Sequence, residues 1–133
     1  MQRKTARENT FILLFEDACK SDECAEEIFL KATEVRGLEV DGYVKTVFFG
    51  VTENRTAIDG AIEEQLVGWK KERISPVSRA LLRLATYEIM FMEDIPAKVS
   101  INEAVELSKK YDDEKSYSFV NGVLNAIREK YRK

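Results

Sequence analysis

The stretch from Ser75 to Met92, SPVSRALLRLATYEIMFM, decides the fold class of this 133-residue chain. Proline suits the first position of a helix after a serine cap, so Ser75-Pro76 predicts a helix start. Apolar side chains then follow helical spacing, and one row holds Val77, Leu81, Leu84 and Glu88. A helix this apolar is typical of the centre of a fold, so we expect other helices to pack around it.

Helical spacing of apolar residues recurs on both sides of this stretch, and the strict alternation typical of strands is absent. It predicts helices over about 4–19, 22–36, 41–69, 100–111 and 117–131. Capping boxes, in which a hydroxyl and a carboxylate bind backbone amides reciprocally, are expected at Thr5–Glu8 and Ser100–Glu103. Gly37 is expected to end the second helix. The third contains Gly50 and Gly60, which weaken it and either allow close packing or introduce a bend.

These patterns predict an all-α fold of about six helices in a single domain, residues 1–133. A solvated link at Lys70–Arg73 separates two three-helix subdomains, approximately 1–70 and 71–133, which share a core through the apolar helix. Charge also changes there: residues 1–69 carry 8 basic and 14 acidic side chains, and residues 70–133 carry 13 and 10. The net charge of −3 argues weakly against a nucleic-acid partner, but local basic patches decide phosphate attraction.

Composition argues against several classes of function. The chain contains no histidine, and Cys19 and Cys24 are expected to be reduced, partly buried thiols, so neither a metal site nor a cofactor is predicted. Neighbouring carboxylates such as Asp112-Asp113 do not face each other on a helix, which argues against an active site. The apolar runs are too short for a membrane span, and no signal segment is recognised, so a cytoplasmic, non-enzymatic protein is expected.

Four segments of the chain carry distinctive motifs: Arg3–Glu8, Pro76–Glu88, Ile95–Leu107 and Phe119–Leu124. In this order and spacing they resemble the NusB family of transcription antitermination factors. The C-terminal half carries the specific motifs, whereas residues 20–70 match mainly by helix pattern and length. The resemblance therefore covers most of the chain and implies a NusB-like fold.

The resemblance also implies a function. NusB family proteins bind a short single-stranded RNA element, boxA, as a heterodimer with the ribosomal protein NusE. The complex joins transcribing RNA polymerase and suppresses termination, notably in ribosomal RNA operons, without a cofactor. Family members differ between monomer and homodimer, so the oligomeric state of this chain stays open.

A cationic patch at the N-terminus is the first part of the implied RNA surface. Arg3, Lys4 and Arg7 lie on or beside the first turn of the first predicted helix and would contact phosphates. As a merely solvated helix start, these cations would oppose the helix dipole, and bound phosphate would offset that cost. Thr5 interrupts a basic run that is often denser in the family, which favours weaker RNA binding here.

Aromatic residues around the polar segment 112–116 are the second part of the implied RNA surface. The resemblance implies that Tyr111 and Phe119 meet unpaired bases, where stacking contributes ~1–3 kcal/mol per base, although a lone aromatic is more often part of a core. Lys115, in the same segment, adds a cation at a place where family members can carry an acidic residue. The acidic neighbours of Lys115 keep the local charge balance negative.

The remaining site residues also come from the resemblance. Asn121 is expected to make a polar contact near the RNA, and Gly122 to allow close helix packing. Phe15 and Ser78 match the positions that contact NusE in the family. Phe15 would be an exposed anchor or a core residue, and Ser78 replaces a common acidic residue, so affinity for NusE is expected to differ.

Two other functions fit the helical pattern. One is a purely protein-binding helical adaptor, which would bind no RNA. The other is a detached copy of the NusB-like domain of ribosomal RNA cytosine methyltransferases. The chain has no G-x-G motif and no room for a cofactor-binding α/β domain, which argues against a methyltransferase.

Overall fold

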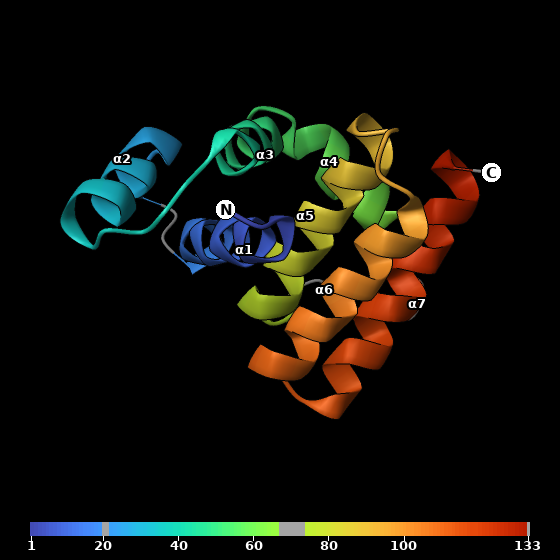
Figure 1. Ribbon diagram of the computed structural model, residues 1–133. Coiled ribbons are helices and arrows are strands. Elements are labelled where there is room, and N and C mark those ends of the chain that lie inside the picture. Colours follow the sequence, from blue (N-terminus) through green and yellow to red (C-terminus); the bar gives the residue numbers. More distant parts are fainter. Residues whose placement is uncertain (20–21, 67–73, 133) are drawn as a thin grey trace.

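The computed structural model describes residues 1–19, 22–66 and 74–132. These residues form seven α-helices and one π-helical segment, with no strand among them (Figure 1). The α-helices are α1 (Arg3–Cys19), α2 (Ala25–Leu30), α3 (Gly42–Glu53), α4 (Arg55–Glu63), α5 (Pro76–Phe91), α6 (Ala97–Tyr111) and α7 (Glu114–Tyr131). The π-helical segment η1 (Lys31–Val35) continues α2, so the predicted second helix changes its winding part-way. The predicted all-α fold is confirmed.

Helix α5 lies at the centre and contacts α1, α3, α4, α6 and α7. Its start is as predicted: the Ser75 hydroxyl accepts a hydrogen bond from the Ser78 backbone amide at 3.0 Å, and Pro76 occupies the first turn. Every residue from Ala80 to Ile89 is buried, so the helix packs on all sides. A single hydrophobic cluster draws residues from α1 to α7.

The predicted third helix is two helices, because the chain breaks at Asn54. Its backbone leaves the helical region, with φ −112° and ψ 23°, and its side-chain amide donates to the Gly50 carbonyl at 2.7 Å. Asparagine side chains compete with the helical hydrogen bonds in this way, which the apolar spacing alone did not indicate. The predicted end of this helix at Val67–Trp69 and the link Lys70–Arg73 lie outside the described residues.

Both predicted capping boxes are wrong. Helix α1 begins at Arg3 and α6 begins at Ala97, so Thr5 and Ser100 lie inside helices. Pro96 precedes α6 with φ −59°, an angle that already suits a helix start. The polar segment is also shorter than expected, since α7 begins at Glu114 with the Asp113 carboxylate accepting from the Ser116 amide at 2.9 Å.

Four glycines differ in what surrounds them. A Cβ on Gly50 would lie 2.5 Å from the Tyr87 ring, so the expected close packing occurs there. A Cβ on Gly60 or Gly122 would meet nothing within 4 Å, and the expectation of close packing at Gly122 is therefore wrong. Gly37 has φ +70°, the left-handed conformation of the predicted helix end.

Two further observations concern classes of function. No helix in the described ranges is long and apolar enough to cross a membrane. Cys19 and Cys24 are free and exposed, which corrects the expectation of partly buried thiols. Cys19 is the last residue of α1, and Cys24 directly precedes the first residue of α2.

Candidate nucleic-acid interface

The first turns of α1 lie against the C-terminal end of α6, although more than a hundred residues separate them in sequence. The Glu8 carboxylate accepts hydrogen bonds from Lys110 Nζ at 2.7 Å and from the Tyr111 hydroxyl. The rings of Phe11 and Tyr111 are in contact, with centroids 5.0 Å apart. The structure therefore packs Glu8 and Phe11, which follow the basic N-terminus on α1, against Tyr111.

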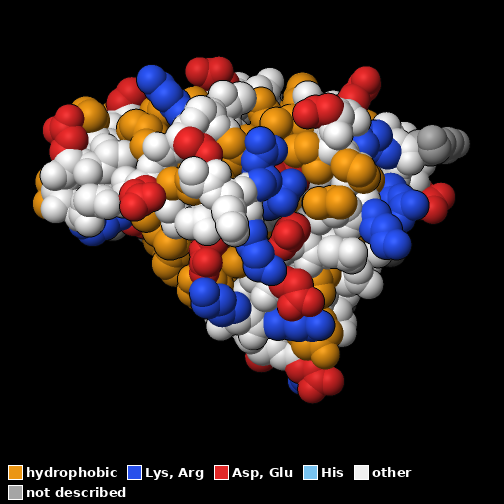
Figure 2. Space-filling view, viewed as in Figure 1, with side chains coloured by type: hydrophobic (Ala, Val, Ile, Leu, Met, Phe, Trp, Pro, Cys, Tyr) orange, Lys and Arg blue, Asp and Glu red, His pale blue; other side chains and the backbone are white. Residues whose placement is uncertain are grey.

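A groove of about 270 Å³ runs between these two helices. Its lining combines cations and carboxylates around one leucine: Lys4, Arg7, Glu8, Glu103, Glu106, Leu107 and Lys110. Figure 2 shows Lys and Arg side chains in a row where α1 meets α6, with Asp and Glu side chains among them. The surface attracts phosphate only at particular points, since its charges alternate.

The charges at the groove hold each other in place. Hydrogen bonds from Lys110 and then Tyr111 lower the pKa of Glu8 below its ordinary value. The same contact with Glu8 raises the pKa of Lys110 and that of Tyr111 above their ordinary values. Tyr111 is 41% exposed, so part of its ring remains open to a ligand.

Arg7 differs from the other two N-terminal cations. It is 5% exposed, and its Nε donates to Glu88 Oε2 at 2.9 Å, so its guanidinium faces the interior. Although burial lowers the pKa of Arg7, the hydrogen bond and charge of Glu88 raise it above its ordinary value. The exposed cations of this segment are therefore Arg3 and Lys4.

Glu88 is the centre of a buried polar cluster that joins four helices. Its Oε2 accepts from Arg7 on α1 and from the Tyr43 hydroxyl on α3, and its Oε1 accepts from the Ser100 hydroxyl at 2.7 Å. Glu88 is 1% exposed, and a buried charge is tolerated only with such partners. Burial, and then the charge of Glu88, raises the pKa of Tyr43 well above its ordinary value.

The ring of Tyr43 also contacts the N-terminal arginines. The Arg3 guanidinium carbon lies 4.4 Å from the ring centroid, and that of Arg7 lies 5.9 Å from it. Tyr43 is 8% exposed, whereas Arg3 is exposed. Arg3 thus rests on an aromatic surface at the edge of the core.

The remaining predicted RNA residues lie on α7, outside the lining of the α1–α6 groove. Lys115 is exposed in the first turn of α7, and Asn121 is exposed two turns later, where its side-chain oxygen accepts from Asn125 at 3.2 Å. Phe119 is half-buried and packs against the core.

The two predicted partner residues differ in exposure. Phe15 is half-buried, with its ring centroid 6.2 Å from that of Phe11. Ser78 is 2% exposed in the first turn of α5. Of the two, only Phe15 presents side-chain surface to a partner.

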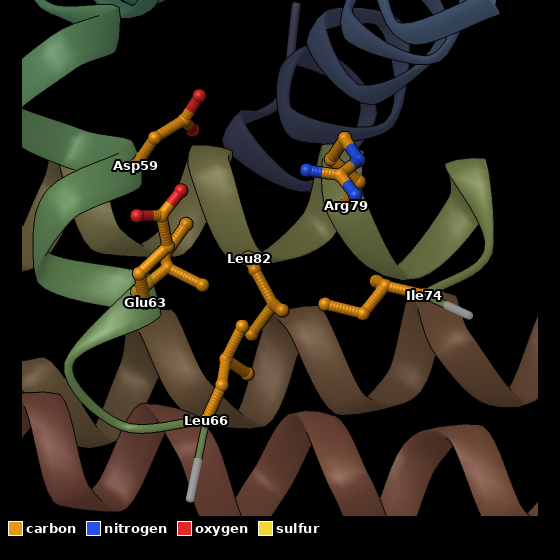
Figure 3. A pocket seen from close by; sticks show the side chains of 7 residues that line it. Asp59, Glu63, Leu66, Ile74, Arg79 and Leu82 are labelled. Carbon is orange, nitrogen blue, oxygen red and sulfur yellow. The ribbon is translucent and has the colours of Figure 1, made fainter. Parts of the chain in front are cut away.

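A second cavity lies between α4 and the start of α5 (Figure 3). Leu66, Ile74 and Leu82 point into it, and charged residues from both helices surround them. Arg83 beside it binds Asp59 through two hydrogen bonds of 2.9 and 3.0 Å. The cavity has a volume of about 10 Å³, which admits about one water molecule, so it is too small for a larger ligand.

Comparison with known proteins decides the family. The NusB family matches residues 4–129. The chain belongs to the NusB family. The protein "Transcription antitermination protein NusB" of Clostridium botulinum (strain Alaska E43 / Type E3) is 46% identical over 133 residues, covering 98% of this chain and 100% of that protein. As a member of this family, the chain is a transcription antitermination protein and not an enzyme, as predicted.

Solved NusB structures share the fold. The structure described as "T. maritima NusB, P3121, Form 2" superposes with a TM-score of 0.87 at 36% identity, covering all of this chain and 94% of that one. Another, "Crystal Structure of Antitermination Factors NusB and NusE in complex with dsRNA", superposes with a TM-score of 0.86 at 32% identity and 97% coverage of both chains. The NusB-like fold is therefore confirmed.

Two buried residues that support the candidate RNA surface were not predicted as site residues: Tyr43 and Glu88. Glu88 left a signal, because an acidic residue within the apolar row of a central helix requires a buried partner. Tyr43 left none, since an aromatic residue at helical spacing is ordinary in a core. Only the packing of α3 against α1 places its ring under Arg3.

Proposed function

We propose that this NusB-family protein binds single-stranded boxA-type RNA together with the ribosomal protein NusE. In the cytoplasm, the assembly would join transcribing RNA polymerase and suppress termination in ribosomal RNA operons. The observation that carries the proposal is the contact of Glu8 with Lys110 and Tyr111. It places the N-terminal part of α1 beside a partly exposed aromatic ring.

Each part of this surface suits a different part of an RNA strand. Arg3 and Lys4 are exposed cations for phosphates, and the open part of the Tyr111 ring suits stacking with an unpaired base. Lys115, Phe119 and Asn121 would continue the contact along α7. Arg7 supports the surface from within, since its guanidinium binds Glu88.

The acidic residues of the groove predict weak RNA binding by the chain alone. Glu8, Glu103 and Glu106 lie among the cations and repel phosphate. NusE would then raise the affinity by adding its own contacts to the strand. On this chain, Phe15 would provide apolar contact area for NusE, and Ser78 would shape the start of α5 without a charge.

A mobility-shift titration tests the proposal with a boxA-type single strand, in the presence and absence of NusE. We expect a shift that strengthens with NusE and is lost with a scrambled strand of the same length. A duplex of the same sequence is a necessary comparison, because the related NusB–NusE structure is described with double-stranded RNA. Equal binding of duplex and single strand would contradict base stacking on Tyr111.

The same titration separates the alternative functions. A protein-binding adaptor would bind NusE but would not shift the RNA, either with NusE or without it. The double variant Arg3→Ala/Lys4→Ala keeps the core intact and removes two exposed cations. It should weaken RNA binding and leave NusE binding unchanged; unchanged RNA affinity would exclude the N-terminus from the interface.

A further inference from the structure

We propose that Tyr43 is a positioning residue for RNA binding: its ring, held by Glu88, carries the Arg3 guanidinium and fixes it at the edge of the RNA surface. The inference rests on the function proposed above and adds a residue from α3 to that surface. Its chain of contacts runs from a buried carboxylate, through an aromatic ring, to an exposed cation.

The contact between Arg3 and Tyr43 leaves the cation free to bind. The guanidinium carbon lies 4.4 Å from the ring centroid, within the range of a cation–π interaction. A guanidinium that stacks on a ring keeps the N–H groups at its edge, which are the groups that bind phosphate. Arg3 itself is exposed, so those groups can reach a ligand.

Tyr43 is held in one orientation from both ends. Its backbone lies in the first turn of α3, where Asp41 caps the helix by accepting from the Val44 amide at 3.0 Å. Its hydroxyl donates to Glu88, which Ser100 at 2.7 Å and Arg7 at 2.9 Å hold in turn. Arg3 therefore rests on a surface that does not rotate away, which reduces the side-chain freedom lost on binding.

The charges at this point favour a bound anion. Arg3 is the first residue of α1, where a cation opposes the helix dipole. Arg7 lies 5.9 Å from the same ring, so two guanidinium groups share one aromatic side chain. Glu88 neutralises Arg7, and an RNA phosphate would neutralise Arg3.

The test is a double-mutant cycle between Arg3 and Tyr43, with affinity for boxA-type single-stranded RNA measured by fluorescence anisotropy in the presence of NusE. Arg3→Ala should weaken binding about two- to fivefold and reduce the log–log salt slope by about 0.7. Tyr43→Phe keeps the ring but loses the hydrogen bond to Glu88, so it should bind less tightly than the unmodified protein and more tightly than Tyr43→Leu. Tyr43→Leu removes the ring and should lose about as much affinity as Arg3→Ala. Adding Arg3→Ala to Tyr43→Leu should cost little more.

The controls separate positioning from folding. Lys130→Ala removes one cation at the C-terminal end of α7, away from the N-terminus in Figure 1, and should leave RNA affinity unchanged. Circular dichroism shows whether each variant is folded at the assay temperature. If Tyr43→Leu is not, Arg3→Lys serves instead, since it keeps the charge without the planar group and should still weaken binding about twofold.

Three results would overturn the inference in distinguishable ways. If Arg3→Ala costs the same affinity with Tyr43→Leu as without it, the ring does not position Arg3, and the proposed function stands. If Arg3→Ala and Lys4→Ala each leave RNA affinity unchanged, the N-terminal phosphate contact fails as well. In the fallback variant, full affinity of Arg3→Lys overturns the stacking contact.

Discussion

Arg7 on α1 and Glu88 on α5 form a buried ion pair, with 2.9 Å between Nε and Oε2 and neither residue more than 5% exposed. The pair connects the N-terminal helix to the central helix at the base of the candidate RNA surface. Tyr43 and Ser100 bind the same carboxylate, so α3 and α6 share the connection. The position of the exposed N-terminal cations therefore depends on a contact inside the core.

Removing either member of this pair should be strongly destabilising. Arg7→Ala or Glu88→Ala leaves an uncompensated buried charge, and we expect each to lower the free energy of unfolding by about 3–5 kcal/mol in urea titrations. The double variant should lose less than the sum of the two. Lys109→Ala, which breaks an exposed pair with Glu106, is the control and should change stability by less than about 1 kcal/mol. A similarly small effect of Arg7→Ala would show that the pair does not hold α1.

The glycines of the third and fourth helices should respond oppositely to alanine. Gly50→Ala places a Cβ against the Tyr87 ring, and we expect a loss of about 1–3 kcal/mol through overpacking. Gly60→Ala meets open space in α4 and should stabilise the protein by about 0.5–1 kcal/mol, because alanine loses less backbone entropy. Urea denaturation of both variants measures this difference. Equal effects at the two positions would mean that the Tyr87 ring moves aside.

Alkaline pH should destabilise the fold through Tyr43. Its folded-state pKa is raised by burial and by Glu88, so the folded protein retains a proton that the unfolded chain releases near pH 10. The stabilisation is complete below pH 10 and is lost progressively as pH rises above it. Thermal unfolding between pH 9 and pH 11 should show a smaller loss for Tyr43→Phe, whose ring does not titrate. Burial also raises the pKa of Tyr87, so Tyr43→Phe should still lose some stability at alkaline pH. Parallel curves for both proteins would contradict the assignment to Tyr43.

Tyr111 should contribute to RNA binding through its ring more than through its hydroxyl. Tyr111→Ala removes the exposed ring and should weaken RNA binding by about 1–3 kcal/mol. Tyr111→Phe loses the hydrogen bond to Glu8 but keeps the ring, and should retain most of the affinity. Anisotropy titrations with NusE present compare the two. Equal losses in both variants would assign the contribution to the hydroxyl.

Glu8 is expected to limit RNA affinity. Its carboxylate binds Lys110 and Tyr111 and repels phosphate, so Glu8→Gln should free Lys110 for the strand and tighten RNA binding severalfold at low salt. Glu129→Gln, near the C-terminal end of α7, removes an equal charge and should have little effect. Weaker binding by Glu8→Gln alone would mean that the carboxylate serves mainly to hold Tyr111.

The fold class was predictable from local rules. The Ser75-Pro76 start and the apolar faces of α5, α6 and α7 depend on spacing and capping that operate within a few residues. Boundaries were wrong where a side chain changed the local hydrogen bonding. Asn54 broke the predicted third helix, and Pro96 moved the start of α6 three residues before Ser100.

The candidate site was predictable only in part. The N-terminal cations and Tyr111 followed from motifs that resemble the NusB family, and in the structure Lys4 lines the same groove as Lys110, the neighbour of Tyr111. The buried role of Arg7 did not follow, because an arginine near a helix start looks the same in sequence whether it faces water or Glu88. At Gly122 the prediction of close helix packing was wrong, because a Cβ there would meet nothing within 4 Å.

The sequence by itself therefore determined the all-α fold class, the central apolar helix and the family, because spacing and motifs are properties of neighbouring residues. Only the tertiary structure decided that Glu88 would bind Arg7, Tyr43 and Ser100 from three other helices. The physical reason is that a buried carboxylate requires hydrogen-bond partners, and tertiary packing decides which residues lie close enough to serve. The partners of Glu88 lie on other helices, so no pattern of neighbouring residues predicts them.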